Sequence, residues 1–465
     1  MAENSAGKKN LSPQLTKFSV SGLLGHFNHH IDFPKNWEFC IIYGPNGVGK
    51  TKVLQIMESV LRLDYEPVLG IPFDSVDMLF DDETRLKIFR HRNTLDLDIS
   101  DLEEEEVLEY YLQFSITIHG RVFSWNYPPR DDEIPVRSLA RNAAVRGIPA
   151  SRLRRMLDSE RTLTPSDRAM LARIRKESLV RTELEVPDVA LAYFRRISVD
   201  FIATQRLLLE EELAQARERR AESGTLAERS AVAELARDLA ARLQEAMAKN
   251  ARVSQQLDRN FPASLLQENI ALRRVSESEI RERYRRQSDL RKELSDIAVL
   301  DAASDIPLPK RNLEDWERIV LSKYLDDTEK KLNSFRTILS QVALFRDIIN
   351  SRFLLKSIVV DREQGFYFLN ESGRRISPRQ LSSGEQHELV MLYTLLFKVS
   401  PGSLVLIDEP EISLHVAWQQ QFLSDMKEIS GVAGVRFIVA THSPQIIHHW
   451  WERAISLEAP GVTNY

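Results

Sequence analysis

The sequence contains one cysteine among 465 residues, Cys40. A single cysteine excludes an internal disulfide and any cysteine-rich zinc site. No apolar run approaches the roughly 18 residues of a transmembrane helix, and we expect no membrane span. The amino-terminal residues are polar and lack the apolar centre of a signal peptide. We therefore expect a cytoplasmic protein.

A strong net charge is also missing. The chain carries 63 Lys and Arg against 68 Asp and Glu, which gives a formal net charge of −5. So small a value indicates neither a nucleic-acid partner nor its absence, and only the distribution of charge is informative. Outside the motifs described next, we find no paired-carboxylate cluster and no Ser/His/Asp constellation.

The strongest motif is G-P-N-G-V-G-K-T, which matches the phosphate-loop pattern G-x-x-x-x-G-K-[ST] at every fixed place. Residues 39–43 before it are typical of a strand, and residues 53–61 after it have helical apolar spacing. Loop amides and a helix N-terminus together form an anion site. Lys50 would reach the β- and γ-phosphates, and the Thr51 hydroxyl would bind Mg²⁺. The predicted nucleotide-binding residues of the loop are Gly44, Pro45, Asn46, Gly47, Val48, Gly49, Lys50 and Thr51.

Two apolar runs far along the chain end in polar residues. The run at 404–407 is short enough for a buried strand and ends in Asp408 and Glu409. The carboxyl ends of strands are where α/β sheets bind ligands. Asp408 suits an Mg²⁺ shell, which prefers oxygen ligands, and Glu409 suits the polarisation of an attacking water. His442 follows a second run at 437–440, and we expect it to donate to a γ-phosphate oxygen at the same sheet edge.

The order of these motifs, with L-S-S-G-E-Q at 381–386, resembles the ABC-type ATPase head of the SMC, Rad50 and RecF group. The runs D-E-P-E-I-S-L-H at 408–415 and A-T-H-S-P at 440–444 are similar to stand-alone ATPases of bacterial antiviral systems. Those systems include the overcoming-lysogenization-defect, Septu and PARIS types. The resemblance covers roughly residues 17–61, 197–206 and 351–450.

This resemblance implies an ATPase that uses ATP and Mg²⁺ and works as a homo-oligomer, at least a dimer. In such heads the signature of one protomer completes the ATP site of another. Ser382, Ser383, Gly384 and Glu385 would therefore act on the nucleotide of a second copy. A Gln after a strand bridges the metal in these heads, and Gln205 is the candidate, with a plain polar strand end as the alternative.

The implied function is that of a sensor ATPase in anti-phage defence, most like the ATPase subunit of PARIS systems. Such a subunit detects a phage anti-restriction protein, in some cases an acidic mimic of DNA, and controls a separate nuclease effector of the Toprim type. Only 23 residues follow His442, so we expect the nuclease to be a separate chain. The alternatives are a Septu-type defence ATPase and a RecF- or Rad50-like DNA-repair ATPase. A transporter subunit is disfavoured, because a coiled-coil insertion has no role there.

Residues 137–181 contain eleven Arg and one Lys against four Asp and Glu, a local net charge of +8. Two interpretations stay open for this segment. It is either an exposed helical face or a surface that docks a polyanion, namely DNA or an acidic phage protein. The segment has few aromatic residues, which argues against single-stranded nucleic acid as its ligand.

Apolar spacing predicts helices in the middle of the chain. The apolar positions between residues 232 and 257 follow a heptad pattern with Asn250 at a core position. The tripeptide 260–262, Asn-Phe-Pro, is expected to end that helix, and the capping box Ser276-x-x-Glu279 to begin a second one, so that the two form a short hairpin. A long helix is predicted from a cap at Asn312 to about residue 350, with Trp316 and Tyr324 on its apolar face.

The predicted fold class is α/β. It is an ABC-type ATPase head with a phosphate-loop parallel sheet, an antiparallel β lobe and a helical, coiled-coil hairpin insertion. Strands are expected at 18–20, 27–33, 76–80, 86–89, 112–118, 122–125, 197–202, 356–360 and 365–369, and residues 403–441 predict a parallel strand–helix–strand unit. The predicted domains are 1–206, with the lobe at 70–127 and the Arg-rich helical insert at 137–181, then the insertion at 207–350 and the second half of the head at 351–465.

Overall fold

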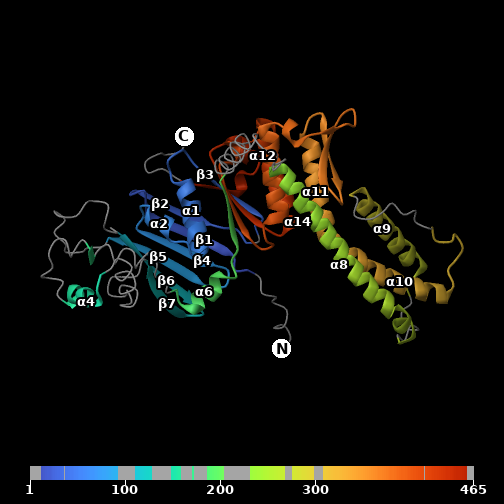
Figure 1. The fold of residues 1–465 in the computed structure, drawn as a ribbon, viewed down its shortest axis with the longest axis horizontal. Coiled ribbons are helices and arrows are strands. Elements are labelled where there is room, and N and C mark those ends of the chain that lie inside the picture. The colour runs from blue at the N-terminus through green and yellow to red at the C-terminus, as the bar shows by residue number, and fades with distance from the viewer. Residues whose placement is uncertain are drawn as a thin grey trace. The chain divides into compact units, whose positions relative to one another are not determined.

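The structure is a computed structural model that describes residues 12–35, 37–92, 110–127, 148–158, 170–171, 186–203, 231–267, 275–297, 307–412 and 414–457. The chain divides into two compact units, whose elements are labelled in Figure 1. The first unit comprises Met1–Ile202, Gly402–Glu409 and Arg436–Tyr465, and the second comprises Ala203–Pro401 and Pro410–Val435. Each unit therefore combines segments that are far apart in the sequence.

The phosphate loop follows a strand of a five-stranded sheet with the order β14-β3-β13-β12-β8. β12 pairs in parallel with β13, β13 with β3, and β3 with β14. The strands are β3 Phe39–Tyr43, β8 Val199–Ala203, β12 Leu404–Asp408, β13 Arg436–Thr441 and β14 Ala454–Ser456. The strands predicted at 39–43, 197–202, 404–407 and 437–440 are confirmed. The three residues of β14 were too few to give a periodic signal.

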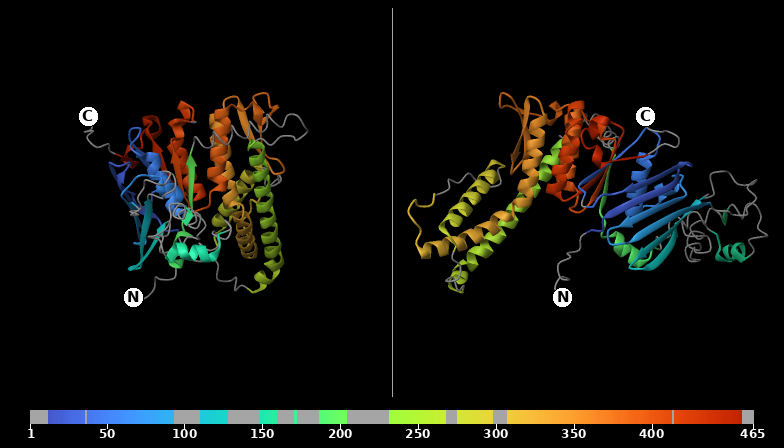
Figure 2. Two further views of the ribbon diagram at one scale, coloured as in Figure 1. Left: turned by 60° about the vertical axis from the view of Figure 1, so that its left-hand side comes forward. Right: turned by 180° about the vertical axis from the view of Figure 1, so that it is seen from behind.

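A second sheet of six antiparallel strands has the order β2-β1-β4-β5-β6-β7 and is drawn in blue to teal in Figure 2. Its strands are β1 Leu15–Leu23, β2 Phe27–Asp32, β4 Ser75–Phe80, β5 Arg85–Arg92, β6 Tyr110–Ile118 and β7 Arg121–Tyr127. The predicted amino-terminal hairpin and the four predicted strands of the lobe are confirmed. Hairpin and lobe belong to one continuous sheet.

Helix α1 (Lys50–Leu61) shares one hydrophobic core with both sheets. Its side chains Val53, Ile56, Met57 and Val60 are fully buried. A helix that is apolar on nearly all sides needs partners on opposite faces, and the two sheets provide them. The other helices of this unit are short: α2 Glu66–Leu69, α4 Ala150–Asp158, α6 Asp188–Phe194, α15 Pro444–Ile447 and the 3-10 turn η8 Trp451–Arg453.

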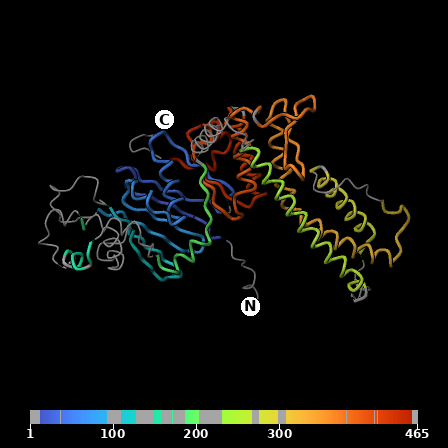
Figure 3. Tube along the Cα trace, in the orientation of Figure 1, coloured from blue at the N-terminus to red at the C-terminus, as the bar shows by residue number. Residues whose placement is uncertain are grey.

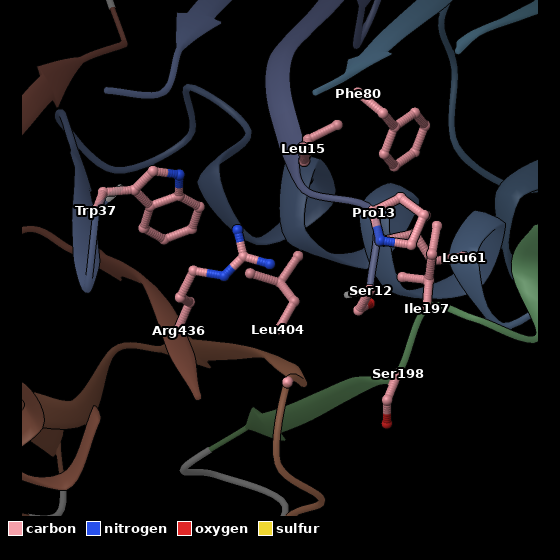
Figure 4. A pocket seen from close by; sticks show the side chains of 11 residues that line it. Ser12, Pro13, Leu15, Trp37, Leu61, Phe80, Ile197, Ser198, Leu404 and Arg436 are labelled. Carbon is pink, nitrogen blue, oxygen red and sulfur yellow. The ribbon is translucent and has the colours of Figure 1, made fainter. Parts of the chain in front are cut away.

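A small cavity lies beside this core, and Figure 4 shows the side chains around it. The Arg436 guanidinium points toward the Trp37 ring, with 5.4 Å to the ring centroid. Burial lowers the pKa of Arg436 below its usual value. The cavity measures about 10 Å³, about the size of one water, and is therefore not a ligand site.

The second unit contains the helical insertion and the signature. Its elements are α8 Ala231–Gln267, α9 Glu277–Asp296, α10 Asp315–Asn333, α11 Arg336–Arg352, β9 Lys356–Asp361, β10 Gly365–Asn370, β11 Arg375–Ile376, η5 Pro378–Gln380, α12 Ser383–Tyr393, the π-helical η6 Thr394–Lys398, η7 Pro410–Ile412, α13 Val416–Gln419 and α14 Phe422–Ala433. The predicted strands at 356–360 and 365–369 are confirmed as β9 and β10. Figure 3 follows the chain out along α8 and back through α10 and α11. Within the described ranges, no helix combines the length and the apolar composition that a membrane span requires.

The predicted end of the first insertion helix is wrong. α8 continues through Pro262 to Gln267. A proline inside a helix removes one backbone donor and disfavours the helical conformation of the residue before it. Here the Ser264 hydroxyl donates to the Phe261 carbonyl at 2.9 Å, so that a side chain supplies a hydrogen bond within this turn.

The predicted single helix from Asn312 to about residue 350 is also wrong. It is two helices, α10 and α11, and Glu314 rather than Asn312 caps the first, in a capping box with Glu317. At the break after Asn333, two side chains bond the carbonyl of Lys331. Asn250 donates to this carbonyl at 2.8 Å and Ser334 donates to it at 2.7 Å.

The helical hairpin pairs different arms from those predicted. Asn250 and the ion pair Lys331–Asp258, at 2.6 Å, join α8 to α10. α9 packs on α10, where Gln287 donates to the Leu325 carbonyl at 2.8 Å. Trp316 and Tyr324 were expected in the core or in a dimer contact, and they are 61% and 43% exposed, so they are not in the core. The packed face of α10 is the one that contacts α8 and α9.

The hairpin β9–β10 makes a close backbone contact with α8. Gly365 has a φ of +76°, and a Cβ at this position would lie 1.8 Å from the Ala236 carbonyl oxygen. Only glycine fits both the left-handed conformation and the contact. The approach of β10 to the base of α8 therefore depends on this residue.

We predict that Gly365→Ala destabilises the protein by about 2 kcal/mol or more, because it adds a steric clash of ~1–3 kcal/mol to a backbone strain of ~1–2 kcal/mol. The matched control is Gly373→Ala. Gly373 has a φ of +73°, but nothing lies within 4 Å of its Cβ position, so this variant carries the strain alone. Urea unfolding midpoints of both variants measure the difference. Equal midpoints would show that the contact with α8 is not close.

Candidate functional site

The phosphate loop has the backbone of an anion site. Gly47 and Gly49 have φ values of 88° and 92°, in the left-handed region that favours glycine. Gly49 caps α1, and a Cβ there would lie 2.7 Å from Cδ2 of Leu23. Left-handed residues in such a turn direct successive amides into one concavity, where they bind an anion. The loop therefore requires these two glycines for its backbone conformation.

Lys50 is the first residue of α1, and its side chain folds back over the loop. Its ammonium group donates to the carbonyls of Gly44 and Pro45 at 2.9 and 3.0 Å. The residue is only 5% exposed. Thr51, in the first turn of α1, is half-buried. A cation and a hydroxyl therefore flank the anion site formed by the loop amides.

The loop backbone is also supported by His29, a side chain that no sequence motif indicated. His29, on β2, contacts the Val48 carbonyl with Nε2 at 2.8 Å and is buried. Because a carbonyl only accepts, Nε2 carries the proton. Burial lowers the pKa of His29, and the hydrogen bond to Val48 opposes this shift. The neutral imidazole thus holds the loop backbone in place. The alternating burial along β2 is a signal that could have marked His29 as inward, but its pairing with Val48 depends on the tertiary fold.

Asp408 and Glu409 lie where the sequence predicted them, at the carboxyl end of β12. Asp408 is buried, and the parallel register sets it opposite Ala440 on β13. The next residue of β13, Thr441, pairs with Tyr43 at the end of β3. Glu409 has a φ of 48°, and its amide donates to the Ala440 carbonyl at 2.9 Å. A left-handed conformation at a non-glycine residue costs ~1–3 kcal/mol and is found most often at functional sites. The turn directs Glu409 away from the path of β12.

His442 lies beside Glu409 at this edge. Its Nδ1 is 3.9 Å from the Glu409 Oε1, and the two side chains are 43% and 25% exposed. The phosphate loop follows β3 at the same edge, because β3, β13 and β12 are neighbouring parallel strands. The first unit therefore brings together the loop, Asp408, Glu409 and His442, as the strand pattern led us to expect.

The signature residues lie in the second unit, at the start of α12. Ser382 caps the helix, and its amide donates to Glu385 at 2.7 Å. Lys356 donates to both Glu385 oxygens, at 2.7 and 3.0 Å. Burial acts to raise the pKa of Glu385, but the hydrogen bonds from Lys356 and Ser382 outweigh it, so the pKa lies below its usual value. Glu385 therefore belongs to the cap rather than to a free binding surface.

Ser383 and Gly384 form the first turn of α12, and nothing lies within 4 Å of the Cβ position of Gly384. The turn is thus open at that point. The body of α12 is held by Arg352 on α11, which forms ion pairs with Glu388 and with Asp425 on α14. Burial lowers the pKa of Arg352 to about 10. Gln205 lies outside the described residues, as do most of residues 137–181.

Two further side-chain clusters have structural explanations. Ser19, His30 and Asp32 form a hydrogen-bonded line, with 2.6 Å between Oγ and Nδ1 and 3.1 Å between Nε2 and Oδ2. The sequence analysis found no such constellation, because antiparallel pairing of β1 with β2 creates it. His30 and Asp32 are 58% and 55% exposed, and Lys17 also binds Asp32, so we assign the line no nucleophilic role.

The adjacent residues His448 and His449 face each other with 2.6 Å between their Nδ1 atoms, and the His449 ring lies 4.6 Å from the Trp450 ring. Trp450 in turn packs edge-on against Phe39. This arrangement agrees with a packing role for the pair. Among the residues that the structure describes, no group of three or more His, Cys, Asp or Glu side chains is arranged to hold a metal ion.

We predict that His29→Leu raises the ATP KM roughly tenfold with little change in kcat. The variant leaves the buried Val48 carbonyl without its donor, at a cost of ~1–3 kcal/mol, and each 1.4 kcal/mol is a factor of ten. The measurement is steady-state ATP hydrolysis. The control is His29→Gln, which keeps a donor, and a Gln variant as impaired as the Leu variant would contradict this role.

The pH dependence of stability provides a second readout. Folding lowers the pKa of His29 below its ordinary value of 6.5. As the pH falls below that value, the unfolded chain therefore binds a proton on this imidazole more readily than the folded chain does. Stability should therefore fall as the pH decreases below that value, and His29→Gln should lose this component.

The chain has recognisable relatives. The model of the family described as "AAA domain, putative AbiEii toxin, Type IV TA system" matches residues 39–448. The "Retron Ec83 probable ATPase" of Escherichia coli is 27% identical over 175 residues, and the match spans 33% of this chain and 32% of that protein. Among solved structures, an Smc head domain from Pyrococcus furiosus, bound to part of ScpA, is 14% identical with a TM-score of 0.32, covering 96% of this chain and 93% of that one. The SMC head domain from Thermotoga maritima is 12% identical with a TM-score of 0.28, covering 95% and 92%. Since the family model covers most of the sequence, the chain belongs to this AAA-domain family.

Proposed function

We propose that the protein hydrolyses ATP with Mg²⁺ at the edge formed by β3, β13 and β12. The observation that carries this proposal is the pairing of Glu409 with His442, 3.9 Å apart, at the sheet edge that also bears the phosphate loop. A strained carboxylate beside an imidazole and an amide-lined anion site suits phosphoryl transfer, in which positioning and charge supply most of the catalysis.

Nucleotide binding would use the loop amides and Lys50. In the structure the Lys50 ammonium donates to two loop carbonyls. On binding, it would exchange these for oxygens of the β- and γ-phosphates, so that its buried charge keeps a full set of acceptors. His29 keeps the Val48 carbonyl directed away from the phosphates, which leaves the neighbouring amides facing them.

The residues present fit a divalent cation beside the phosphates. The Thr51 hydroxyl and the buried Asp408 carboxylate are the oxygen donors that Mg²⁺ prefers, and Mg²⁺ usually keeps several waters. When bound, it neutralises charge on the β- and γ-phosphates. We propose that Thr51 and Asp408 hold it and that Gln205 orients one of its waters.

Glu409 is the proposed general base. Its Oε1 takes a proton from the water that attacks the γ-phosphorus, while the bond to the leaving ADP oxygen breaks. His442, with its ring next to that carboxylate, donates to a γ-phosphate oxygen and stabilises the charge that develops there. The left-handed backbone of Glu409 keeps the carboxylate in position before the nucleotide binds.

We predict that Glu409→Gln lowers ATP turnover by roughly 10²–10⁴-fold while ATP binding is retained, because only the positioned base is lost. Lys50→Ala should instead lose ATP binding. The measurements are phosphate release and equilibrium binding of a fluorescent ATP analogue. Glu371→Gln, on an exposed turn, is the matched control and should behave as wild type. Near wild-type turnover in Glu409→Gln would rule out this assignment.

The signature is proposed to act in trans, in a dimer or larger homo-oligomer. Two features support this. The open first turn of α12 at Gly384 leaves its amides accessible to an anion, and its cap is stabilised by Lys356 and the Glu385 capping box. We propose that Ser382, Ser383 and Gly384 bind the γ-phosphate of a second copy, and that Glu385 maintains the turn.

A mixing experiment tests this arrangement. Lys50→Ala and Gly384→Asp protomers should each be inactive alone, and an equal mixture should recover roughly a quarter of wild-type activity if random dimers form with one intact site per mixed pair. Native mass spectrometry verifies that mixed pairs form. Absence of recovery when mixed pairs hold one nucleotide would contradict sharing in trans. Occupancy of neither site would indicate that the two sites bind nucleotide together.

For the cellular role, we propose an anti-phage defence ATPase, since the chain resembles a retron ATPase over about a third of its length. In the form we favour, PARIS-like, it detects a phage anti-restriction protein and controls a separate Toprim-type nuclease. The Arg-rich segment 137–181 would dock that acidic protein or DNA. A Septu-type ATPase and a RecF- or Rad50-like repair ATPase are the alternatives. A nuclease gene beside this one would favour defence.

A further inference from the structure

The six-stranded antiparallel sheet has a second face that the ATPase site does not use. Side chains alternate along its strands, and the buried set, with Leu86, Ile88 and Phe114, forms the core. The intervening side chains face solvent and carry aromatic rings, cations and hydroxyls. On β5 and β6 this outer set includes Arg85, Lys87, Phe89, His91, Tyr111 and Gln113.

Three aromatic rings form a platform on this face. Phe89 is 39% exposed although it lies in the middle of a sheet. His91 is stacked on Tyr111, its partner on β6, with ring centroids 5.1 Å apart and an interplanar angle of 26°. The His91 Nε2 also contacts the Gln113 Oε1 at 3.1 Å, which fixes the ring. The rings are therefore held in place before any ligand binds.

The strands that carry the platform are basic. β5, β6 and β7 contain four Arg and one Lys and no Asp or Glu, and of these Arg85 and Lys87 belong to the outer set, whereas Arg90, Arg92 and Arg121 alternate with the buried side of the sheet. Arg85 forms an ion pair with Asp77 on β4, and Arg90 covers the Tyr110 ring at 3.5 Å. Lys87 lies on the outer face directly opposite Asp77 and two residues from Phe89. Lys87 therefore supplies one cation beside the rings.

A polar cavity adjoins the platform. It measures about 350 Å³, within the range of small-ligand pockets, and is lined by Ser19, Val20, Ser21, Asn28, His29, His30, Ser75 and Asp77. Ser75 pairs with Phe89 in the sheet register, so the cavity and the platform are next to each other. Its hydroxyl, amide and imidazole groups both donate and accept hydrogen bonds, as the edges of nucleobases require.

We propose that this outer face binds single-stranded nucleic acid. Bases stack on the Phe89 and His91 rings, one base edge enters the cavity beside Ser75, and Lys87 contacts the phosphate backbone. An open β-sheet with exposed rings and nearby cations is suited to unpaired bases, whose ring faces are accessible. A duplex keeps those ring faces stacked inside, which leaves the platform without a role. This site is distinct from the Arg-rich segment.

The test is fluorescence anisotropy of the full-length protein with labelled oligomers of about 12 nucleotides, which covers a typical site size. The probes are oligo-dT, oligo-rU and a duplex of equal length, titrated without ATP. We expect tighter binding of a single strand than of the duplex, and the dT and rU arms distinguish DNA from RNA. Phe89→Ala should weaken single-strand binding by roughly fivefold or more through lost stacking. Lys87→Gln should reduce the salt slope of log Kd by about 0.7, the value for one phosphate contact.

Matched controls are Trp316→Ala, an aromatic residue on α10 that is more exposed than Phe89, and Lys310→Gln, an exposed lysine in the second unit. Both should bind as wild type, and all variants should keep wild-type ATP turnover and unfolding midpoints. The proposal is overturned if the wild-type protein prefers duplex or binds neither strand at low salt. It is also overturned if Phe89→Ala and Lys87→Gln behave as the controls, or if Arg152→Gln with Arg154→Gln on α4 abolishes binding while those two variants do not.

Discussion

The parallel pairing of β12 with β13 and of β13 with β3 is the constraint on which the rest of the ATPase site depends. These strands are fully buried over most of their length, so their register cannot slip without exposing apolar side chains to water. Because the strands run in the same direction, their carboxyl ends meet at one edge. The phosphate loop, Asp408 and His442 lie at that edge, where residues separated by about 400 positions in the sequence come together.

The backbone strain at Glu409 is tolerated at this edge because the surrounding sheet holds the turn. Glu409 adopts a left-handed backbone conformation, and the loop contains two more such residues at Gly47 and Gly49. The Glu409 amide keeps its hydrogen bond to Ala440, so the turn loses no backbone pairing. His29 adds a neutral donor below the loop. A strained turn with satisfied hydrogen bonds is a rigid turn, and rigidity serves a reaction that depends on positioning.

The signature turn depends on charge rather than on strain. Lys356 and the capping box hold Glu385, and Arg352 connects α12 with α11 and α14 through two buried carboxylates. Removal of one partner of a buried ion pair destabilises the fold strongly, because the other charge stays buried. The arm of α8 and α10 is joined to the same unit through the Gly365 contact and the hydrogen bond from Tyr393 to Asp238, at 2.6 Å.

The sequence by itself determined the parts of this protein that depend on neighbours along the chain. The phosphate loop, the ends of β12 and β13, the capped start of α9 and most strands were predicted, because spacing and turn chemistry act over a few residues. The tertiary structure alone decided the contacts between distant residues. Asn250 donates to the Lys331 carbonyl near the end of α10, His29 supports Val48, and the pairing of β5 with β6 stacks His91 on Tyr111. None of these has a local signal, since each requires two segments whose approach is set by the packing of the whole unit.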